Sequence, residues 1–279
     1  MLDAELAALL WLLIEARLPV TVIGAAGSGR TTLLTALLDL LPPDARPVTV
    51  AGPDEEFEWL PEAVELGWRR ERARPVAPAR ARAQSTTAVM LVAELADRPP
   101  AGTWGPRARI VIRALALGYG LAATMPGERL EDAFEALRSA PVTADDDELS
   151  RLGLVLAVRA IEPGVRHRLG AAHYVRPVVR DAHGHVQRLP PAVLAAWDAR
   201  TDELEHFAWG LAGELAGRTG RRAVELEREQ ARRAVYLAGL VASGLSDPDA
   251  VRTAIAAYRT AGNPAGGPAG EPAEGRSTG

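Results

Sequence analysis

The residues whose types and spacing most clearly suggest chemistry lie near the N-terminus of this sequence. Residues 24–32 read Gly-Ala-Ala-Gly-Ser-Gly-Arg-Thr-Thr, which matches the pattern Gly-x-x-x-x-Gly-basic-Ser/Thr with Arg where the pattern has Lys. Glycines let the backbone curl so that consecutive N–H groups face an anion, and a following helix adds its partial positive charge. We therefore predict a phosphate-binding loop formed by Gly24, Gly27, Ser28, Gly29, Arg30, Thr31 and Thr32.

The sequence on either side of this loop has the context that the pattern needs. Residues 18–23 are a β-branched apolar run that predicts a buried strand, and residues 31–41 form a Leu-rich helix ended by two prolines. The alternative is a tight turn without a ligand. That interpretation explains one or two of the glycines, but it does not explain three glycines followed by Arg-Thr-Thr at the start of a helix.

The elements that must position the loop alternate between strands and helices. Strands are predicted at residues 18–23, 47–50, 88–93, 120–125, 152–158 and 174–180, and helices at 4–17, 31–41, 101–116 and 128–140. This alternation predicts an α/β fold with a mostly parallel sheet flanked by helices. The last third reads as helices at 191–199, 202–217, 221–243 and 247–259. We therefore expect a core at 1–190, a C-terminal helical region at 191–261 and a disordered tail at 262–279.

Composition excludes several classes of function. The chain has 279 residues and a net charge of −4, so no global positive charge favours nucleic acid or an anionic membrane as a partner. It contains no Cys, which excludes disulfides and thiol catalysis, and every Lys/Arg cation is an Arg. The apolar run at residues 6–14 is far shorter than the ~20 residues that span a bilayer. We expect a cytoplasmic protein without its own transmembrane segment.

In collinear order, segments between residues 3 and 260 resemble the archaeal type II/IV secretion-system ATPases, the motor group of pili and archaella. The opening helix, phosphate loop and following strand resemble the family's P-loop region, and residues 88–95 (AVMLVAEL) resemble its Walker B strand. Residues 113–137 and the helical run at 221–259 resemble later family segments. The resemblance implies a RecA-like P-loop core that binds ATP and Mg²⁺.

Site roles and partners follow from the same resemblance. It implies that the Thr31 hydroxyl contacts Mg²⁺ and that Glu94, at the end of the Walker B strand, acts on the metal or on its bound water. A solvent-facing carboxylate at a strand end is the alternative for Glu94. The expected partners are other ATPase subunits, in a hexamer, and a membrane platform protein, which would place the chain peripherally at the inner face of the membrane. Nucleic acid is not expected as a partner.

The departures from the family pattern are as informative as the matches. The family's large N-terminal domain is expected to be lacking, and an Arg expected just after Glu94 is absent. Altered positions are Arg30 for Lys, Ala51-Gly52 for the acidic box, Tyr119 for His and Pro126 for His. Asp54, Glu55 and Glu56 lie just beyond the altered acidic box and could substitute for it.

These departures lead to three hypotheses. The first is a nucleotide-binding ATPase-like subunit of a type II/IV secretion or type IV pilus assembly system with weak or lost hydrolysis. The second is an inactive regulatory or scaffold subunit that co-assembles with a full-length secretion ATPase. The third is an unrelated small P-loop NTPase or kinase.

Two other groups of residues could form a metal site or a phosphate-binding surface. His183 and His185 flank Gly184, and we interpret them as a surface turn rather than a metal site, since no carboxylate pair follows at ligand spacing. Residues 69–82 carry six Arg, which could face phosphates or a neighbouring subunit, or form a solvated loop, the interpretation we favour.

Overall fold

The computed structural model describes residues 2–68, 87–98, 100, 102–162, 166–180, 183 and 185–261, without the side chain of residue 180. The Arg-rich stretch 69–82, Gly184 and the tail 262–279 lie outside the described residues. The chain divides into two compact units, Met1–Ala238 and Gly239–Gly279. The first unit contains the sheet and the candidate site, and the second is described only by its helix.

An eight-stranded sheet forms the centre of the first unit, in the order β10-β9-β6-β5-β1-β4-β3-β2. Neighbouring strands from β5 to β2 are parallel, whereas β6, β9 and β10 are added through antiparallel pairings. The strands are β1 Val20–Gly24, β2 Arg46–Thr49, β3 Ala88–Val92, β4 Gly120–Met125, β5 Leu154–Glu162, β6 Arg166–Tyr174, β9 Ala192–Asp198 and β10 Glu203–His206.

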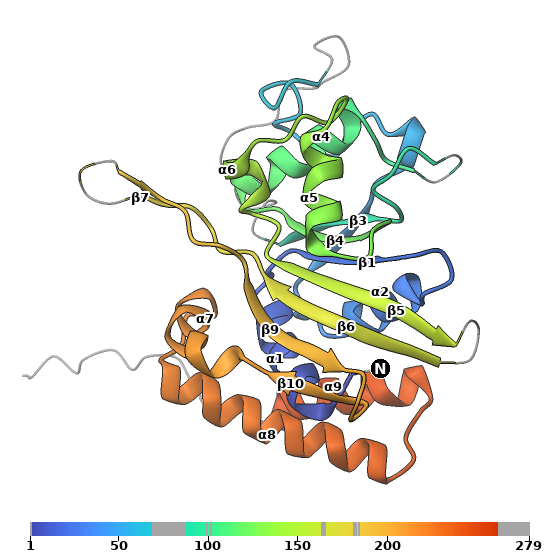
Figure 1. Cartoon of the computed structure of the whole chain (residues 1–279), viewed down its shortest axis with the longest axis vertical. Helices are drawn as coiled ribbons and strands as arrows, with labels where there is room; N and C mark the ends of the chain where they lie inside the picture. The colour runs from blue at the N-terminus through green and yellow to red at the C-terminus, as the bar shows by residue number, and fades with distance from the viewer. Residues whose placement is uncertain are drawn as a thin grey trace, which may run out of the picture. The chain divides into compact units, whose positions relative to one another are not determined.

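Strand β1 lies in the interior of the sheet, between β4 and β5 (Figure 1). Val22 pairs with Thr124 on one side and Leu156 on the other. All residues of β1 and β4 are buried, as expected of parallel strands covered on both faces. The predicted α/β fold class, a mostly parallel sheet flanked by helices, is therefore confirmed.

Helices cover both faces of the parallel strands. Figure 1 shows α4 (Pro106–Ala114) and α5 (Leu130–Arg138) on one side of the sheet, and α1 (Ala4–Glu15) and α2 (Arg30–Leu38) on the other. Alternate residues of a strand point to opposite faces, so Ile23, Ala123 and Ala157 join the core beneath α4 and α5. The short helix α6 (Asp146–Leu149) starts with a capping box between Asp145 and Glu148.

Sequence reasoning was wrong about the strands that extend the sheet. Residues 191–199 and 202–206 were expected to be helical, but Ala192–Asp198 and Glu203–His206 form β9 and β10. The segment at 192–196 is rich in Ala, which favours helix locally, and pairing with β6 overrides that weak preference. The expected strand at 174–180 is also wrong, because β6 ends at Tyr174 and only Val179–Arg180 pairs, as β7, with β8 (Val186–Gln187).

The C-terminal helices follow the sheet directly. They are the 3₁₀ helix η3 (Ala208–Leu211), α7 (Ala212–Arg218), α8 (Ala223–Ala242) and, in the second unit, α9 (Pro248–Ala261). The helices predicted at 221–243 and 247–259 are confirmed, whereas the division of domains at residue 190 stays a prediction. Among the described helices, none is both long and apolar enough to cross a membrane.

A buried arginine attaches α8 to α1. Arg233 Nη2 lies 2.6 Å from Glu15 Oε2 and its Nε lies 3.0 Å from Glu229 Oε1. The guanidinium carbon also lies 4.4 Å from the ring centroid of Trp11. One ion pair, with Glu15, and a cation–π contact with Trp11 thus join α1 to α8, and the second ion pair, with Glu229, lies within α8 and holds the guanidinium in place.

Candidate functional site

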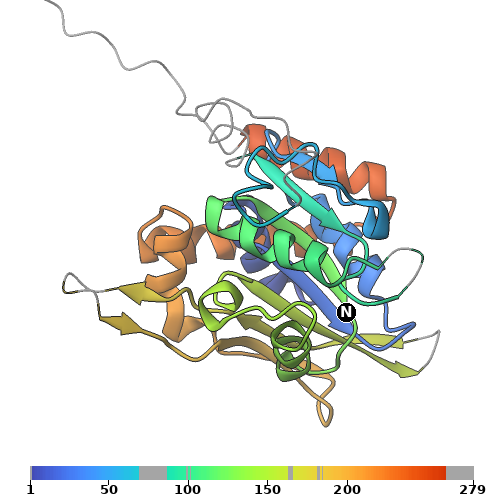
Figure 2. The same ribbon diagram turned by 90° about the horizontal axis from the view of Figure 1, so that it is seen from above.

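The glycine-rich loop connects the C-terminal end of β1 to the N-terminal end of α2, and Figure 2 shows this part of the fold from a second side. Gly27 and Gly29 have φ angles of 75° and 91°, in the left-handed region that favours glycine. Gly29 is the N-cap of α2, and no side chain caps the helix. Since the first N–H groups of a helix have no intrahelical partner, the loop offers donors and a positive dipole end to an anion.

Gly24 is required by close packing rather than by its backbone angle. A Cβ atom at this position would lie 2.3 Å from Ser28 Oγ and 2.6 Å from the carbonyl oxygen of Val158 in the neighbouring strand. Both distances are shorter than any van der Waals contact between these atoms. The loop can therefore fold back over the end of β1 only when residue 24 lacks a side chain.

Two buried polar atoms of the loop have no hydrogen-bond partner among the described residues. They are Ser28 Oγ, in a residue that is 1% exposed, and Arg30 Nη1. Leaving a buried polar group unsatisfied costs about 1–3 kcal/mol. Their position beside the open end of α2 means that an oxyanion bound in the loop would have two further donors within the same segment.

Arg30, the first residue of α2, and Glu94, which follows β3, meet at this loop. Arg30 Nη2 lies 3.1 Å from Glu94 Oε1, and the two side chains are 12% and 16% exposed. Glu94 follows β3, where its carbonyl oxygen accepts a hydrogen bond of 2.8 Å from the N–H of Thr103. The structure thus brings together the basic residue of the loop and the acidic residue that follows the Walker B-like strand.

The two threonines of the loop are exposed, unlike Ser28. Thr31 and Thr32 lie in the first turn of α2 and are exposed. Their hydroxyl groups are therefore accessible at the helix end, as a metal contact by Thr31 would need. Within the described ranges, no group of three or more His, Asp or Glu side chains could hold a metal ion, so a metal here would depend on Thr31, Glu94 and the phosphate oxygens themselves.

The acidic residues after the altered acidic box have structural contacts. The Glu55 side chain is buried and accepts hydrogen bonds from the N–H groups of Ala51 at 2.8 Å and Phe57 at 2.5 Å. It also accepts one from Trp59 Nε1 at 3.2 Å. Because its carboxylate is occupied by its own loop, Glu55 is poorly placed to replace the family's catalytic acid.

Tyr119, which stands where the family has His, is part of the core. Its hydroxyl donates to Glu62 Oε2 at 3.0 Å, and its ring lies edge-on to Trp59 at 6.0 Å. Burial, together with the hydrogen bond to and the charge of Glu62, raises the pKa of the Tyr119 phenol well above its usual range. The neutral phenol therefore serves packing and cannot accept a proton as a His would.

Thr124, for which the sequence predicted no role, lies next to the site. It sits near the carboxyl end of β4, its hydroxyl donates to the carbonyl oxygen of Ala93, and its own carbonyl accepts from the N–H of Leu95 at 2.7 Å. These contacts hold the chain on both sides of Glu94. A polar residue within an otherwise apolar strand was the signal that could have identified it.

The fold and this site define a class: an α/β protein with a glycine-rich loop between an interior strand of a mostly parallel sheet and the uncapped N-terminus of a helix. Comparison with known protein families found no family model that matches, and comparison with curated proteins found no match. Among solved structures, the chain is similar to the crystal structure of the VirB11 ATPase from the Brucella suis type IV secretion system in complex with sulphate. The identity is 20%, the TM-score is 0.41, and the match covers 61% of this chain and 52% of that one. The chain thus matches about half the length of that protein.

Proposed function

We propose that the chain binds ATP together with Mg²⁺ at the loop of residues 24–32, as an ATPase-like subunit with weak or lost hydrolysis. The observation that carries the proposal is the pair of buried atoms without partners, Ser28 Oγ and Arg30 Nη1, beside the uncapped N-terminus of α2. A phosphate would satisfy these donors and the backbone N–H groups at once. The alternative, a turn without a ligand, leaves both atoms without a partner.

Each residue of the loop has a distinct role in this proposal. Gly24, Gly27 and Gly29 allow the backbone to approach the phosphates, and Ser28 and Arg30 donate to their oxygens. The Thr31 hydroxyl would hold Mg²⁺, and Glu94 would orient the metal or its water. When bound, ATP supplies the phosphoryl group whose transfer to water is the reaction.

Three features favour slow hydrolysis. Arg30 pairs with Glu94, so the cation and the acid neutralise each other. Glu55 is occupied by its own loop, and Tyr119 is a buried phenol in place of a base. Charged or donor groups aimed at the developing charge each contribute orders of magnitude to a rate, so their loss or occupation lowers turnover steeply.

The collinear sequence resemblance supports a place for this activity in a type II/IV secretion or type IV pilus assembly system. In that setting the chain assembles with other ATPase subunits, as a hexamer, and with a membrane platform protein at the cytoplasmic face. The Arg30–Glu94 pair favours a second candidate function, an inactive regulatory or scaffold subunit that co-assembles with an active secretion ATPase.

Binding and hydrolysis measured on the same preparation test these proposals. Calorimetric titration with ATP and Mg²⁺ should show binding to the wild-type chain and a loss of at least about tenfold for Arg30→Ala, since a phosphate loses a charge-assisted donor. Arg200→Ala, at an exposed ion pair with Asp198, is the matched control and should bind normally. Absence of binding would overturn nucleotide recognition, and turnover as fast as that of an active secretion motor would overturn weak hydrolysis. Binding without any turnover would favour the scaffold subunit.

A further inference from the structure

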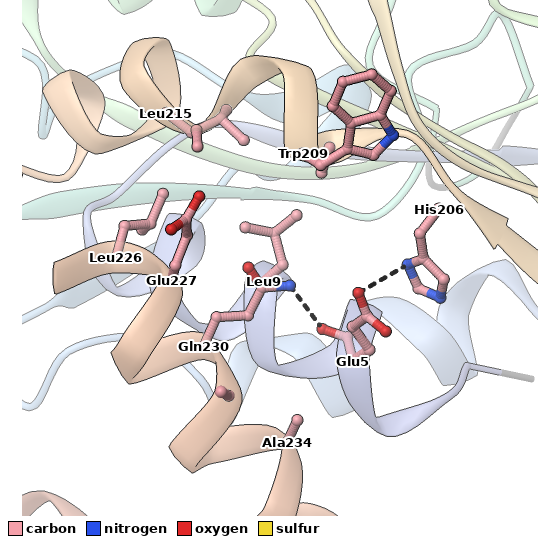
Figure 3. A pocket seen from close by; sticks show the side chains of 12 residues that line it. Glu5, Leu9, His206, Trp209, Leu215, Leu226, Glu227, Gln230 and Ala234 are labelled. Atoms are coloured by element: carbon pink, nitrogen blue, oxygen red, sulfur yellow. Dashed lines mark hydrogen bonds and ion pairs between the residues drawn. The ribbon is translucent and has the colours of Figure 1, made fainter. Parts of the chain in front are cut away.

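A pocket of the first unit lies apart from the glycine-rich loop, since no residue of 24–32 lines it. It is a pocket of about 450 Å³ between α1, the segment η3–α7 and the first half of α8 (Figure 3). Leu9, Leu215 and Leu226 form its apolar floor, together with small Ala side chains. Its volume lies within the range of pockets that bind ligands, about 300–1,000 Å³.

The mouth of this pocket is acidic. Glu5 and Glu227 project at its rim from α1 and α8, next to His206 and Gln230 (Figure 3). Glu5 lies 3.9 Å from His206 Nδ1, and its side chain is still 60% exposed. Within the described part of the chain Glu227 forms no ion pair, and the pocket is lined by no Arg. A cation bound at the rim would therefore meet two carboxylates that face no Arg of the pocket lining, with His206 beside Glu5.

Exposed apolar side chains lie at the pocket and beside it. Trp209 is a lining residue and is 82% exposed. Phe207, directly before the lining residue Ala208, is 43% exposed. Exposed apolar side chains rimmed by polar groups mark binding surfaces, and Trp209 gives this pocket an exposed aromatic ring.

We propose that this pocket is the docking site for a basic amphipathic segment of a partner protein. Arg or Lys residues of the partner would place their cations at Glu5 and at Glu227, and an aliphatic stem would lie against the Trp209 ring. An aliphatic side chain of the same segment would enter the floor at Leu9, Leu215 and Leu226. The proposal is independent of nucleotide binding, because none of the residues of the phosphate loop lines this pocket.

The test uses two synthetic amphipathic peptides that differ only in charge. The first carries Leu at helical i, i+3, i+7 spacing with Arg between them, and the second has Glu at each Arg position. Titration calorimetry without nucleotide should show that the Arg peptide binds the wild-type chain and that the Glu peptide does not. Free arginine methyl ester forms a third arm and should bind far more weakly than the peptide.

Matched variants locate the binding. Glu227→Gln should weaken the Arg peptide about fivefold, and Trp209→Ala at least about tenfold, as expected for a carboxylate and an aromatic anchor at an interface. Glu128→Gln, at an exposed carboxylate outside the pocket, should change nothing. Since Trp209 is exposed, its truncation should leave the melting temperature unchanged, which thermal unfolding verifies.

Several outcomes would overturn the proposal. Equal affinity of the chain for the two peptides would show that the charge of the peptide does not matter. If Glu227→Gln and Trp209→Ala bound the Arg peptide as the wild type does, the peptide would bind elsewhere. No measurable binding of the Arg peptide would exclude the surface as a docking site for basic segments. If arginine methyl ester bound as tightly as the Arg peptide, the pocket would be a site for a small cation instead.

Discussion

The Arg30 guanidinium donates to the Glu94 carboxylate across the phosphate loop, with Nη2 and Oε1 3.1 Å apart although the residues are 64 positions apart in sequence. Both side chains are mostly buried, so the pair is shielded from solvent and salt. A phosphate in the loop must compete with Glu94 for Arg30. The same contact therefore both positions the basic residue and reduces the charge that it offers to a ligand.

Removing the charge of Glu94 should strengthen nucleotide binding. In Glu94→Gln the amide still fits the site but holds Arg30 less strongly, and a gain of about 1 kcal/mol corresponds to an affinity about fivefold higher. Titration with ATP in EDTA excludes any contribution of Glu94 through a metal. Asp97→Asn, at an exposed carboxylate three residues later, is the control. An affinity equal to or below that of the wild type would show that Glu94 does not compete for Arg30.

Replacing Gly24 should damage the loop itself. In Gly24→Ala the new methyl group would meet Ser28 Oγ and the Val158 carbonyl oxygen, and overpacking of this kind costs about 1–3 kcal/mol. Urea unfolding should show that loss, and nucleotide binding should fall with it. Gly213→Ala in α7 is the matched control, since nothing lies within 4 Å of its added Cβ, and it should be neutral or stabilising by up to about 1 kcal/mol. Equal stability of the two variants would contradict the close packing at Gly24.

Replacing the buried Arg233 of α8 should lower the free energy of unfolding. Arg233→Ala removes the buried guanidinium that pairs with Glu15 and Glu229 and covers Trp11, and breaking a buried pair costs about 3–5 kcal/mol. The measurement is the free energy of unfolding in urea. Arg232→Ala, which removes a largely exposed partner of Glu229, should cost less than about 1 kcal/mol. Similar losses in both variants would mean that burial of Arg233 contributes nothing.

His173 should make stability depend on pH on the acidic side of neutrality. Burial in β6 lowers its pKa below the ordinary value of 6.5, and the charge of Glu131 only partly opposes this. Below about pH 6.5 the unfolded chain therefore binds a proton that the folded chain does not, so the folded state loses stability as the pH falls.

The variant His173→Gln isolates this contribution. Its melting temperature should fall less between pH 7.5 and pH 5.5 than that of the wild type, and His185→Gln, at an exposed His, should behave as the wild type does. Identical pH dependence in wild type and His173→Gln would rule His173 out as the source.

Local patterns were sufficient for the elements around the loop and insufficient for the far side of the sheet. The apolar β-branched run before Gly24 and the Leu-rich run after Arg30 form β1 and α2 because their local preference and their burial agree. For β9 they disagree: Ala favours helix in isolation, and the strand forms because its Ala residues pair with Ala171 and Ala172 of β6. Pairing partners that distant are not visible in a local pattern.

The sequence by itself determined the order of strand, glycine-rich turn and helix, because glycine spacing and hydrophobic periodicity act over a few residues. It also indicated Glu94 as the end of a buried strand. Only the tertiary structure decided that Arg30 pairs with Glu94, that the Glu55 carboxylate accepts hydrogen bonds from its own loop and that Tyr119 belongs to the core. It alone placed Glu5 and Glu227 at one pocket. The physical reason is that charge pairing and burial depend on distances through space, which the sheet and its crossovers set, and not on separation along the chain.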